Sequence, residues 1–126
     1  MNVDTRFSTS APAAIGCYCH MAVIGNTGYI SGQLPLNPVS MTIEATTSEL
    51  QAQASLSNLL AILKDNGLDK TAVAKTTIFL SDMSDFSAVN AVYSDFFGEH
   101  RPARSCFAVN GLPMNALVEI EAIVAL

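Results

Sequence analysis

The clearest hydrophobic pattern in the chain predicts a helix between residues 46 and 67. Thr46 and Glu49 match the Ser/Thr-x-x-Glu arrangement that caps helix N-termini, and Gly67 stands where a glycine commonly ends a helix. Between them, apolar residues recur at helical spacing: Ala52, Leu56, Leu59, Leu60 and Leu63. One face of this helix is therefore expected to pack against a core.

A second helix is predicted to begin near Ser84 or Asp85 and to end at Gly98. Its expected buried face consists of Phe86, Val89, Asn90, Tyr93, Phe96 and Phe97. Because Asn90 is polar, it needs partners there, either backbone groups of the core or a ligand. Residues 73–80, just before this helix, are rich in β-branched and apolar residues and predict a buried strand.

Extended segments are predicted towards both ends of the chain. Residues 18–24 and 27–31 are joined by Gly25-Asn26, a dipeptide typical of hairpin turns. Residues 103–109 and 117–126 alternate as strands do. The order of strands, helix, strand, helix and two strands predicts a single α+β domain of all 126 residues, with a mixed sheet and both helices on one face.

The last two predicted strands differ in the chemistry of their two faces, because side chains alternate along a strand. The residues that we expect the helices to cover are Phe107, Val109, Val118 and Ile120. Arg104, Cys106 and Glu119 would then project from the opposite face. Since that face carries few charges, we assign it to contacts between subunits and expect chemistry at such an interface.

Composition narrows the possible functions. Half of the residues are hydrophobic and only 13% are charged, so part of the surface is expected to be covered by further copies of the chain or, alternatively, by other proteins. The net charge of −5 and the scattering of the six basic residues argue against nucleic acid as a partner. No apolar stretch is long enough to span a membrane, and the N-terminus lacks the pattern of a signal peptide. Three cysteines do not indicate a disulfide framework, so a cytoplasmic location is expected.

Arg104 is a candidate anchor for a small carboxylate, because a guanidinium group matches a carboxylate with two parallel hydrogen bonds. From its position alone, an ion pair with Glu119 or Glu121 is the alternative. Glu119 could orient or activate a water molecule if it is partly buried, or could merely be the partner of Arg104.

The run Cys17-Tyr18-Cys19-His20 suggests metal or thiol chemistry. In an extended chain Cys17 and Cys19 lie on one side and Tyr18 and His20 on the other, so the four cannot easily converge on one zinc ion. No second metal-ligand motif, phosphate loop or dinucleotide fingerprint is present, and we expect neither a metal nor a cofactor. Buried, inert thiols are the simpler interpretation.

Several segments stand in a single register from Ala11 onward. They are Ala14-Ile15-Gly16, Tyr29-Ile30-Ser31-Gly32-Gln33-Leu34-Pro35, Thr76-Thr77-Ile78-Phe79-Leu80, Val89-Asn90, Phe96-Phe97-Gly98-Glu99, Arg101-Pro102-Ala103-Arg104-Ser105-Cys106 and Val118-Glu119-Ile120-Glu121-Ala122. In this order they resemble the reactive-intermediate deaminase family (RidA, YjgF), also called the L-PSP endoribonuclease family.

The resemblance implies a chorismate-mutase-like fold with a six-stranded mixed sheet, and a homotrimer with a central β-barrel and sites in the clefts between subunits. It also implies hydrolysis of 2-iminopropanoate and 2-iminobutanoate to 2-oxo acids and ammonia, without a cofactor. The implied catalytic residues are Arg104, which binds the substrate carboxylate, and Glu119, which positions water. The residues implied to contact the substrate are Tyr18, Ser31, Gly32, Asn90, Arg104 and Cys106.

The chain also departs from the family pattern. The family usually has Gly-Pro-Tyr-Ser-Gln where this chain has Gly16-Cys17-Tyr18-Cys19-His20, and the loop at residues 37–42 lacks the usual glycine. These changes bear on substrate preference. Two other functions stay open, namely binding or sensing of small 2-oxo acids without catalysis, and a chaperone-like or regulatory trimer. A ribonuclease role fits poorly with the net charge of −5.

Overall fold

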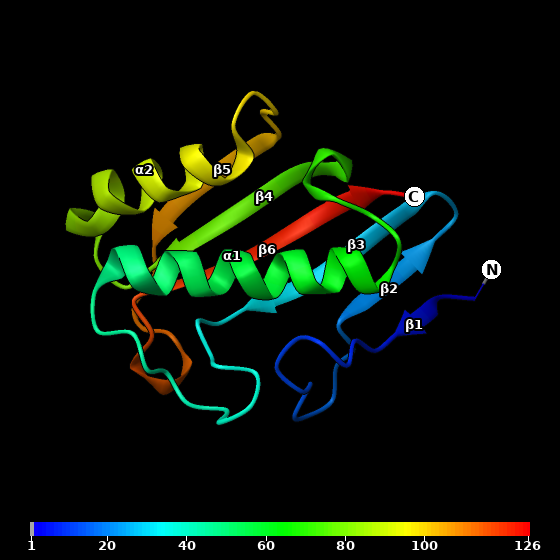
Figure 1. The fold of residues 1–126 in the computed structure, drawn as a ribbon, viewed down its shortest axis with the longest axis horizontal. Helices are drawn as coiled ribbons and strands as arrows, with labels where there is room; N and C mark the ends of the chain where they lie inside the picture. The colour runs from blue at the N-terminus through cyan, green and yellow to red at the C-terminus, as the bar shows by residue number, and fades with distance from the viewer. Residues whose placement is uncertain (1) are drawn as a thin grey trace.

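The computed structural model describes residues 2–126 as a six-stranded sheet with two helices on one of its faces (Figure 1). The strands and helices are β1 (Asp4–Arg6), β2 (Met21–Ile24), β3 (Thr27–Gln33), α1 (Ser48–Asp65), β4 (Val73–Leu80), α2 (Phe86–Phe97), β5 (Ala103–Ala108) and β6 (Val118–Ala125). The predicted α+β class and the predicted order of the elements are confirmed. No helix among the described residues is long and apolar enough to cross a membrane.

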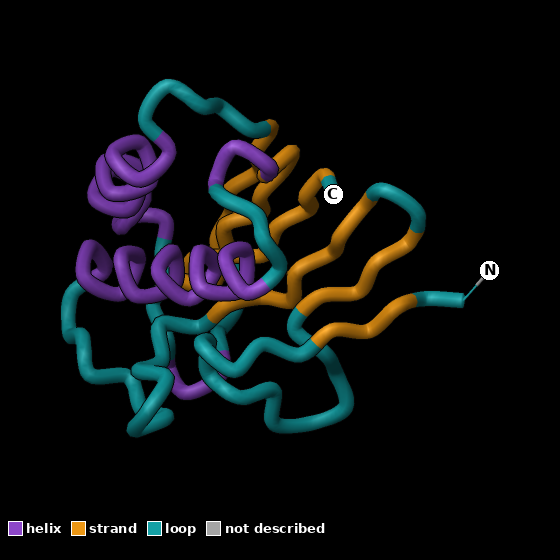
Figure 2. The backbone as a smooth tube through the Cα atoms, turned by 45° about the vertical axis from the view of Figure 1, so that its right-hand side comes forward, coloured by secondary structure: helices purple, strands orange, loops and turns teal. Residues whose placement is uncertain are grey.

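The strands are ordered β1-β2-β3-β6-β4-β5 across the sheet. All neighbours are antiparallel except β4 and β5, which are parallel and are connected through α2. A parallel pair requires such a crossover, and the crossover places α2 on the same face as α1. Figure 2 shows both helices on one side of the sheet. The core lies between the helices and this face of the sheet.

The ends of α1 follow from local hydrogen bonds. The helix begins one residue later than the predicted capping box requires, because the N-cap is Thr47 rather than Thr46. Thr47 Oγ1 accepts a hydrogen bond from the backbone of Leu50 at 3.3 Å. At the other end Gly67 has a φ of 71° and donates to the carbonyl of Lys64 at 3.0 Å, as the predicted terminal glycine should.

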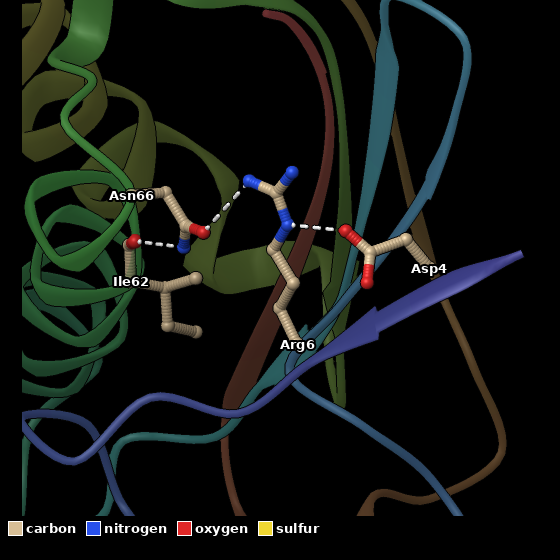
Figure 3. A network of polar contacts seen from close by, with 4 residues as sticks. All are labelled: Asp4, Arg6, Ile62 and Asn66. Carbon is tan, nitrogen blue, oxygen red and sulfur yellow. Dashed lines mark hydrogen bonds and ion pairs between the residues drawn. The ribbon is translucent and has the colours of Figure 1, made fainter.

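Strand β1 was not predicted from the hydrophobic pattern, because its three residues are polar. It pairs with β2 and is also tied to the end of α1 (Figure 3). Arg6 Nε forms an ion pair with Asp4 at 2.8 Å, and Arg6 Nη1 donates to Asn66 Oδ1 at 3.3 Å. Asn66 Nδ2 in turn donates to the carbonyl of Ile62 at 2.8 Å. The start of the chain is therefore held against the helical layer.

Strand β5 faces the opposite way from the prediction. Arg104 lies beside Thr76 of β4, and Cys106 lies beside Ile78. Thr76 and Ile78 are both buried under the helices, so Arg104 and Cys106 face the helical layer. The expectation that Arg104 and Cys106 project from the open face is therefore wrong.

The neighbouring positions on β5 and β6 complete this correction. Phe107, which we expected beneath the helices, lies on the open face with its ring 5.4 Å from that of Phe79. Glu119 also lies beside Phe79 and faces away from the helices, as predicted. Val118 and Ile120 are buried in the core, also as predicted. Both faces of β5 mix apolar and polar side chains, so their alternation alone could not show which face lies under the helices. The pairing of β5 with β4 shows it.

Candidate active site in two halves

The residues predicted for the site lie in two separate hollows. We name the first, of about 450 Å³, the arginine pocket; it is lined by Asn90, Tyr93, Ser94, Phe97, Gly98, His100, Arg101, Pro102 and Arg104. We name the second, of about 660 Å³, the glutamate pocket; it is lined by Ala13, Ile15, Tyr18, Ser31, Gly32, Leu34, Leu36, Met41, Pro113, Met114, Glu119 and Glu121.

Arg104 is held in place by groups of α2. Its Nη1 donates to Asn90 Oδ1 at 2.6 Å, and its guanidinium carbon lies 5.0 Å from the ring centre of Tyr93 and 5.7 Å from that of Phe86. Within residues 2–126, no carboxylate lies within ion-pair distance of Arg104, so Arg104 forms no ion pair with Glu119 or Glu121 of its own chain. The guanidinium group is thus oriented while most of its donors remain free for a ligand.

Asn90 finds a partner that the sequence did not suggest. We expected backbone groups or a ligand, and its side-chain oxygen instead accepts from Arg104. Tyr93, one helical turn further on, stacks against the same guanidinium group. Its hydroxyl group forms a hydrogen bond of 2.6 Å with Thr76 Oγ1. Burial raises the pKa of Tyr93, so its hydroxyl is neutral. The spacing of Phe86, Asn90 and Tyr93 at four and then three residues was the available signal for this arrangement.

Glu119 occupies the glutamate pocket against an irregular part of β3. Pairing between β3 and β6 shifts after Ile30, so that Ser31 and Gly32 bulge towards β6. A Cβ atom on Gly32 would stand only 2.6 Å from Glu119 Oε2, so a side chain at position 32 would displace the carboxylate from its present position. Burial, reinforced by the negative charge of Glu121, raises the pKa of Glu119.

Ser31 connects this bulge to the segment that carries Tyr18. Ser31 Oγ donates to the carbonyl of Cys19 at 2.7 Å, and its backbone donates to that of His20 at 3.1 Å. Tyr18, Ser31, Gly32 and Glu119 are thus brought together in one hollow. By contrast, Cys106 lines neither pocket; it packs against the core, and burial raises the pKa of its thiol.

The residues around Tyr18 do not form a metal site. His20 is buried, with Nδ1 accepting from the backbone of Ser8 at 3.0 Å and Nε2 donating to the carbonyl of Pro12 at 2.8 Å. All three cysteines are free, and Cys17 is exposed, so the interpretation as buried thiols is wrong for that residue. Among the described residues, no three His, Cys, Asp or Glu side chains gather where they could hold a metal ion.

The two pockets are opposite in charge. Apart from one tyrosine in each, the ionisable groups of the arginine pocket are His100, Arg101 and Arg104, whereas those of the glutamate pocket are Glu119 and Glu121. Arg104 faces the helical layer and Glu119 the open face of the sheet, so the two groups cannot reach one ligand within a single chain. Glu121 was missed as a member of the site, although its place two residues from Glu119 on a strand was a usable signal.

The comparisons with known proteins agree on the class of protein that this fold and these pockets define. The family described as "Endoribonuclease L-PSP" matches residues 8–126. The 2-iminobutanoate/2-iminopropanoate deaminase of Escherichia coli is 45% identical over 122 residues and covers 94% of each chain. The "Putative regulator AldR" of Lactococcus lactis is 47% identical and covers 90% of each chain.

A solved structure gives the same result in three dimensions. That of TdcF from Escherichia coli, with bound serine, superimposes with a TM-score of 0.91 at 38% identity and covers 98% of each chain. This chain therefore belongs to the endoribonuclease L-PSP family, the RidA/YjgF family that its motifs resemble.

Proposed function

We propose that this protein hydrolyses 2-imino acids, such as 2-iminopropanoate and 2-iminobutanoate, to 2-oxo acids and ammonia. The observation that carries the proposal is the separation of charge between the two pockets. One holds an oriented guanidinium group without a carboxylate partner, and the other holds a half-buried carboxylate beside a glycine. Hydrolysis of a small carboxylic acid at an electrophilic carbon would use both groups, the guanidinium to bind the acid's carboxylate and the glutamate to take a proton from water.

The site would form between subunits of a homotrimer, with the arginine pocket of one copy facing the glutamate pocket of the next. Arg104 and Glu119 lie on opposite faces of the sheet, so a second copy is the simplest source of the missing half. The open face also exposes Tyr29 and Phe107, each 46% accessible, whose burial would favour such contacts. A reducing compartment such as the cytoplasm suits the three free cysteines.

The chemistry then needs little from the protein. Arg104, oriented by Asn90, binds the substrate carboxylate and places the imine carbon near Glu119 of the neighbouring copy. The protonated imine is already electrophilic, so a water molecule adds to its carbon and loses a proton to the Glu119 carboxylate. Glu119 then returns the proton to the nitrogen of the carbinolamine. As the C–N bond breaks and ammonia leaves, the hydroxyl oxygen becomes the carbonyl oxygen of the 2-oxo acid and gives its proton to the Glu119 carboxylate, which passes it on to solvent. The raised pKa of Glu119 suits a group that both accepts and returns a proton.

The relatives support this proposal at the level of the family. The Escherichia coli protein named as an imine deaminase is similar over nearly its whole length, and TdcF was solved with an amino acid bound. The relative named as a putative regulator favours instead a regulatory role, for which the same pocket would bind a small carboxylate without turnover.

The test uses an imine generated in solution. A threonine dehydratase releases 2-iminobutanoate, semicarbazide traps it, and the protein is added. We expect the wild type to lower the yield of trapped product sharply and R104A to have almost no effect. If the wild type leaves trapping unchanged, or if R104A lowers it equally, the proposal fails. Binding of 2-oxobutanoate without any effect on trapping would identify a sensor instead.

A further inference from the structure

The backbone adopts an unusual conformation at two points around the glutamate pocket. The non-glycine residues with positive φ in residues 2–126 are Met41 (58°), Met114 (58°) and Asn115 (56°). L-residues with large side chains avoid this left-handed region for steric reasons. Met41 lies in the loop before α1 and Met114 in the turn before β6, yet both line the glutamate pocket. Figure 1 shows these two segments close together at one end of the sheet.

Hydrogen bonds within the loop around Met41 hold this residue in the left-handed conformation. Asn37 and Thr42 are joined by a backbone hydrogen bond of 2.9 Å, and the amide of Met41 donates to Asn37, also at 2.9 Å. The side chain of Asn37 accepts from the amides of Val39 and Ser40 at 2.8 and 3.1 Å. A glycine would fit such a loop without strain, so the presence of methionine requires a reason beyond the loop.

The walls on either side of the methionines are fixed by buried amide side chains of α1. Asn58 donates to the carbonyls of Leu34 and Leu36 at 3.0 and 2.9 Å. Gln51 accepts from the amide of Leu117 at 2.8 Å, which anchors the end of the turn that contains Met114. Both strained residues are therefore held in a rigid frame, with their side chains at the pocket.

The pocket itself has a polar end and an apolar end. Ser31, Gly32 and Glu119 form the polar end, where we place the reacting carbon. The larger apolar side chains are those of Ile15, Leu34, Leu36, Met41 and Met114, with Ala13 and Pro113 beside them. In a single chain Ile15 is 73% exposed and Met114 56% exposed, so apolar groups of the neighbouring subunit and of the substrate have apolar surface to cover here. The methyl or ethyl group of the shortest imino acids is too small to contact all of these side chains.

We propose that Met41 and Met114 form a side-chain subsite that makes this protein prefer 2-imino acids with long apolar side chains, branched or thioether, over those with methyl or ethyl groups. The inference rests on the proposed function and specifies its substrate class. Methionine suits this role because its flexible, polarisable thioether adapts to apolar groups of different shapes. The backbone strain is retained because the side chains are used.

The test compares imines that a broad-specificity L-amino-acid oxidase generates from leucine, methionine and alanine. With semicarbazide trapping, we expect the wild-type kcat/KM to be about tenfold or more higher for the leucine and methionine imines than for the alanine imine, the usual discrimination of an apolar pocket. M41G and M114G should each lower this ratio several-fold, and M41L should retain it. M41G should also melt at the same or a higher temperature, because glycine relieves the left-handed strain.

The matched control is V39A, which changes a fully exposed residue of the same loop that does not line the pocket. It should leave both the ratio and the melting temperature unchanged. A wild type that hydrolyses the alanine imine as fast as the leucine imine, or a ratio that survives both glycine substitutions, would overturn this inference and leave the proposed function standing. A wild type that hydrolyses none of the imines would overturn both.

Discussion

Ser55 Oγ, near the middle of α1, is buried without a hydrogen-bond partner among the described residues. A buried hydroxyl without a partner destabilises the folded state, and alanine is the better helix former. We therefore expect S55A to raise the free energy of unfolding by about 1 kcal/mol, measured by urea denaturation. The matched control is S57A, which makes the same change at an exposed position of α1 and so measures helix propensity alone. If S55A stabilises no more than S57A, the hydroxyl has a partner after all.

The activity is expected to depend on pH through the protonation of Glu119. Burial and the neighbouring charge of Glu121 raise its pKa, so the carboxylate that accepts the water proton is lost at a higher pH than for an ordinary glutamate. Activity should fall as pH decreases through this raised pKa. E121Q removes the repelling charge and should move the fall in activity to lower pH, whereas E99Q, at an exposed position outside both pockets, should not. E119Q should lower kcat roughly a hundredfold at pH values above the pKa of Glu119, and the difference from the wild type should shrink below it, where the wild-type carboxyl is also neutral. A pH profile unchanged by E121Q would contradict the coupling of the two carboxylates.

Among the elements, the segment after β1 depends on one carboxylate at the end of α1. Asp65 accepts hydrogen bonds from Ser8 and Ser10, including one from Ser10 Oγ at 2.8 Å, and the bond from Ser8 contributes most to lowering its pKa. A lowered pKa in the folded state means stability that is present above the unfolded value of 3.8 and is lost as pH falls through the folded value. We expect D65N to melt at a lower temperature than the wild type at pH 7 and to lose less stability on acidification below pH 4. Thermal melts across this pH range test the prediction; parallel curves for the two proteins would contradict it.

Elements with local sequence signals could be predicted from the sequence, whereas features that depend on contacts between elements could not. The two long helices and the hairpin were predictable because their apolar spacing and turn residues are local signals. The faces of β5 were not, because they depend on pairing with β4, and Phe107 found an apolar neighbour, Phe79, on the open face. The partner of Arg104 was missed for the same reason, since the expected face placed it near Glu119 rather than near Asn90. For Met41 the signal was the missing glycine of its loop, which pointed to the loop but not to this residue, because its conformation is set by hydrogen bonds within the loop.

At the scale of the whole molecule, the placement of Arg104 and Glu119 on opposite faces of one sheet makes a prediction about mixed oligomers. If each site takes its arginine from one subunit and its glutamate from the next, R104A and E119Q are each inactive alone but complement each other. In a randomly mixed trimer, a site has an intact arginine half of the time and an intact glutamate half of the time, so roughly a quarter of the sites are intact. Co-expression with different tags and purification through both removes the inactive homotrimers and leaves trimers with two copies of one variant and one of the other. Each of these has one intact site out of three, so the purified trimers should recover about a third of the wild-type activity.

The control for this complementation is the pairing of R104A with the double variant R104A/E119Q. It has the same oligomeric state and the same tags, but no subunit supplies an intact arginine, so it should remain inactive. Recovery in the first mixture and not in the second can arise only from sites shared between chains, because neither chain of the first mixture holds both groups. If the first mixture stays inactive although mixed trimers are isolated, then Arg104 and Glu119 do not meet across subunits, and the two pockets serve separate ligands.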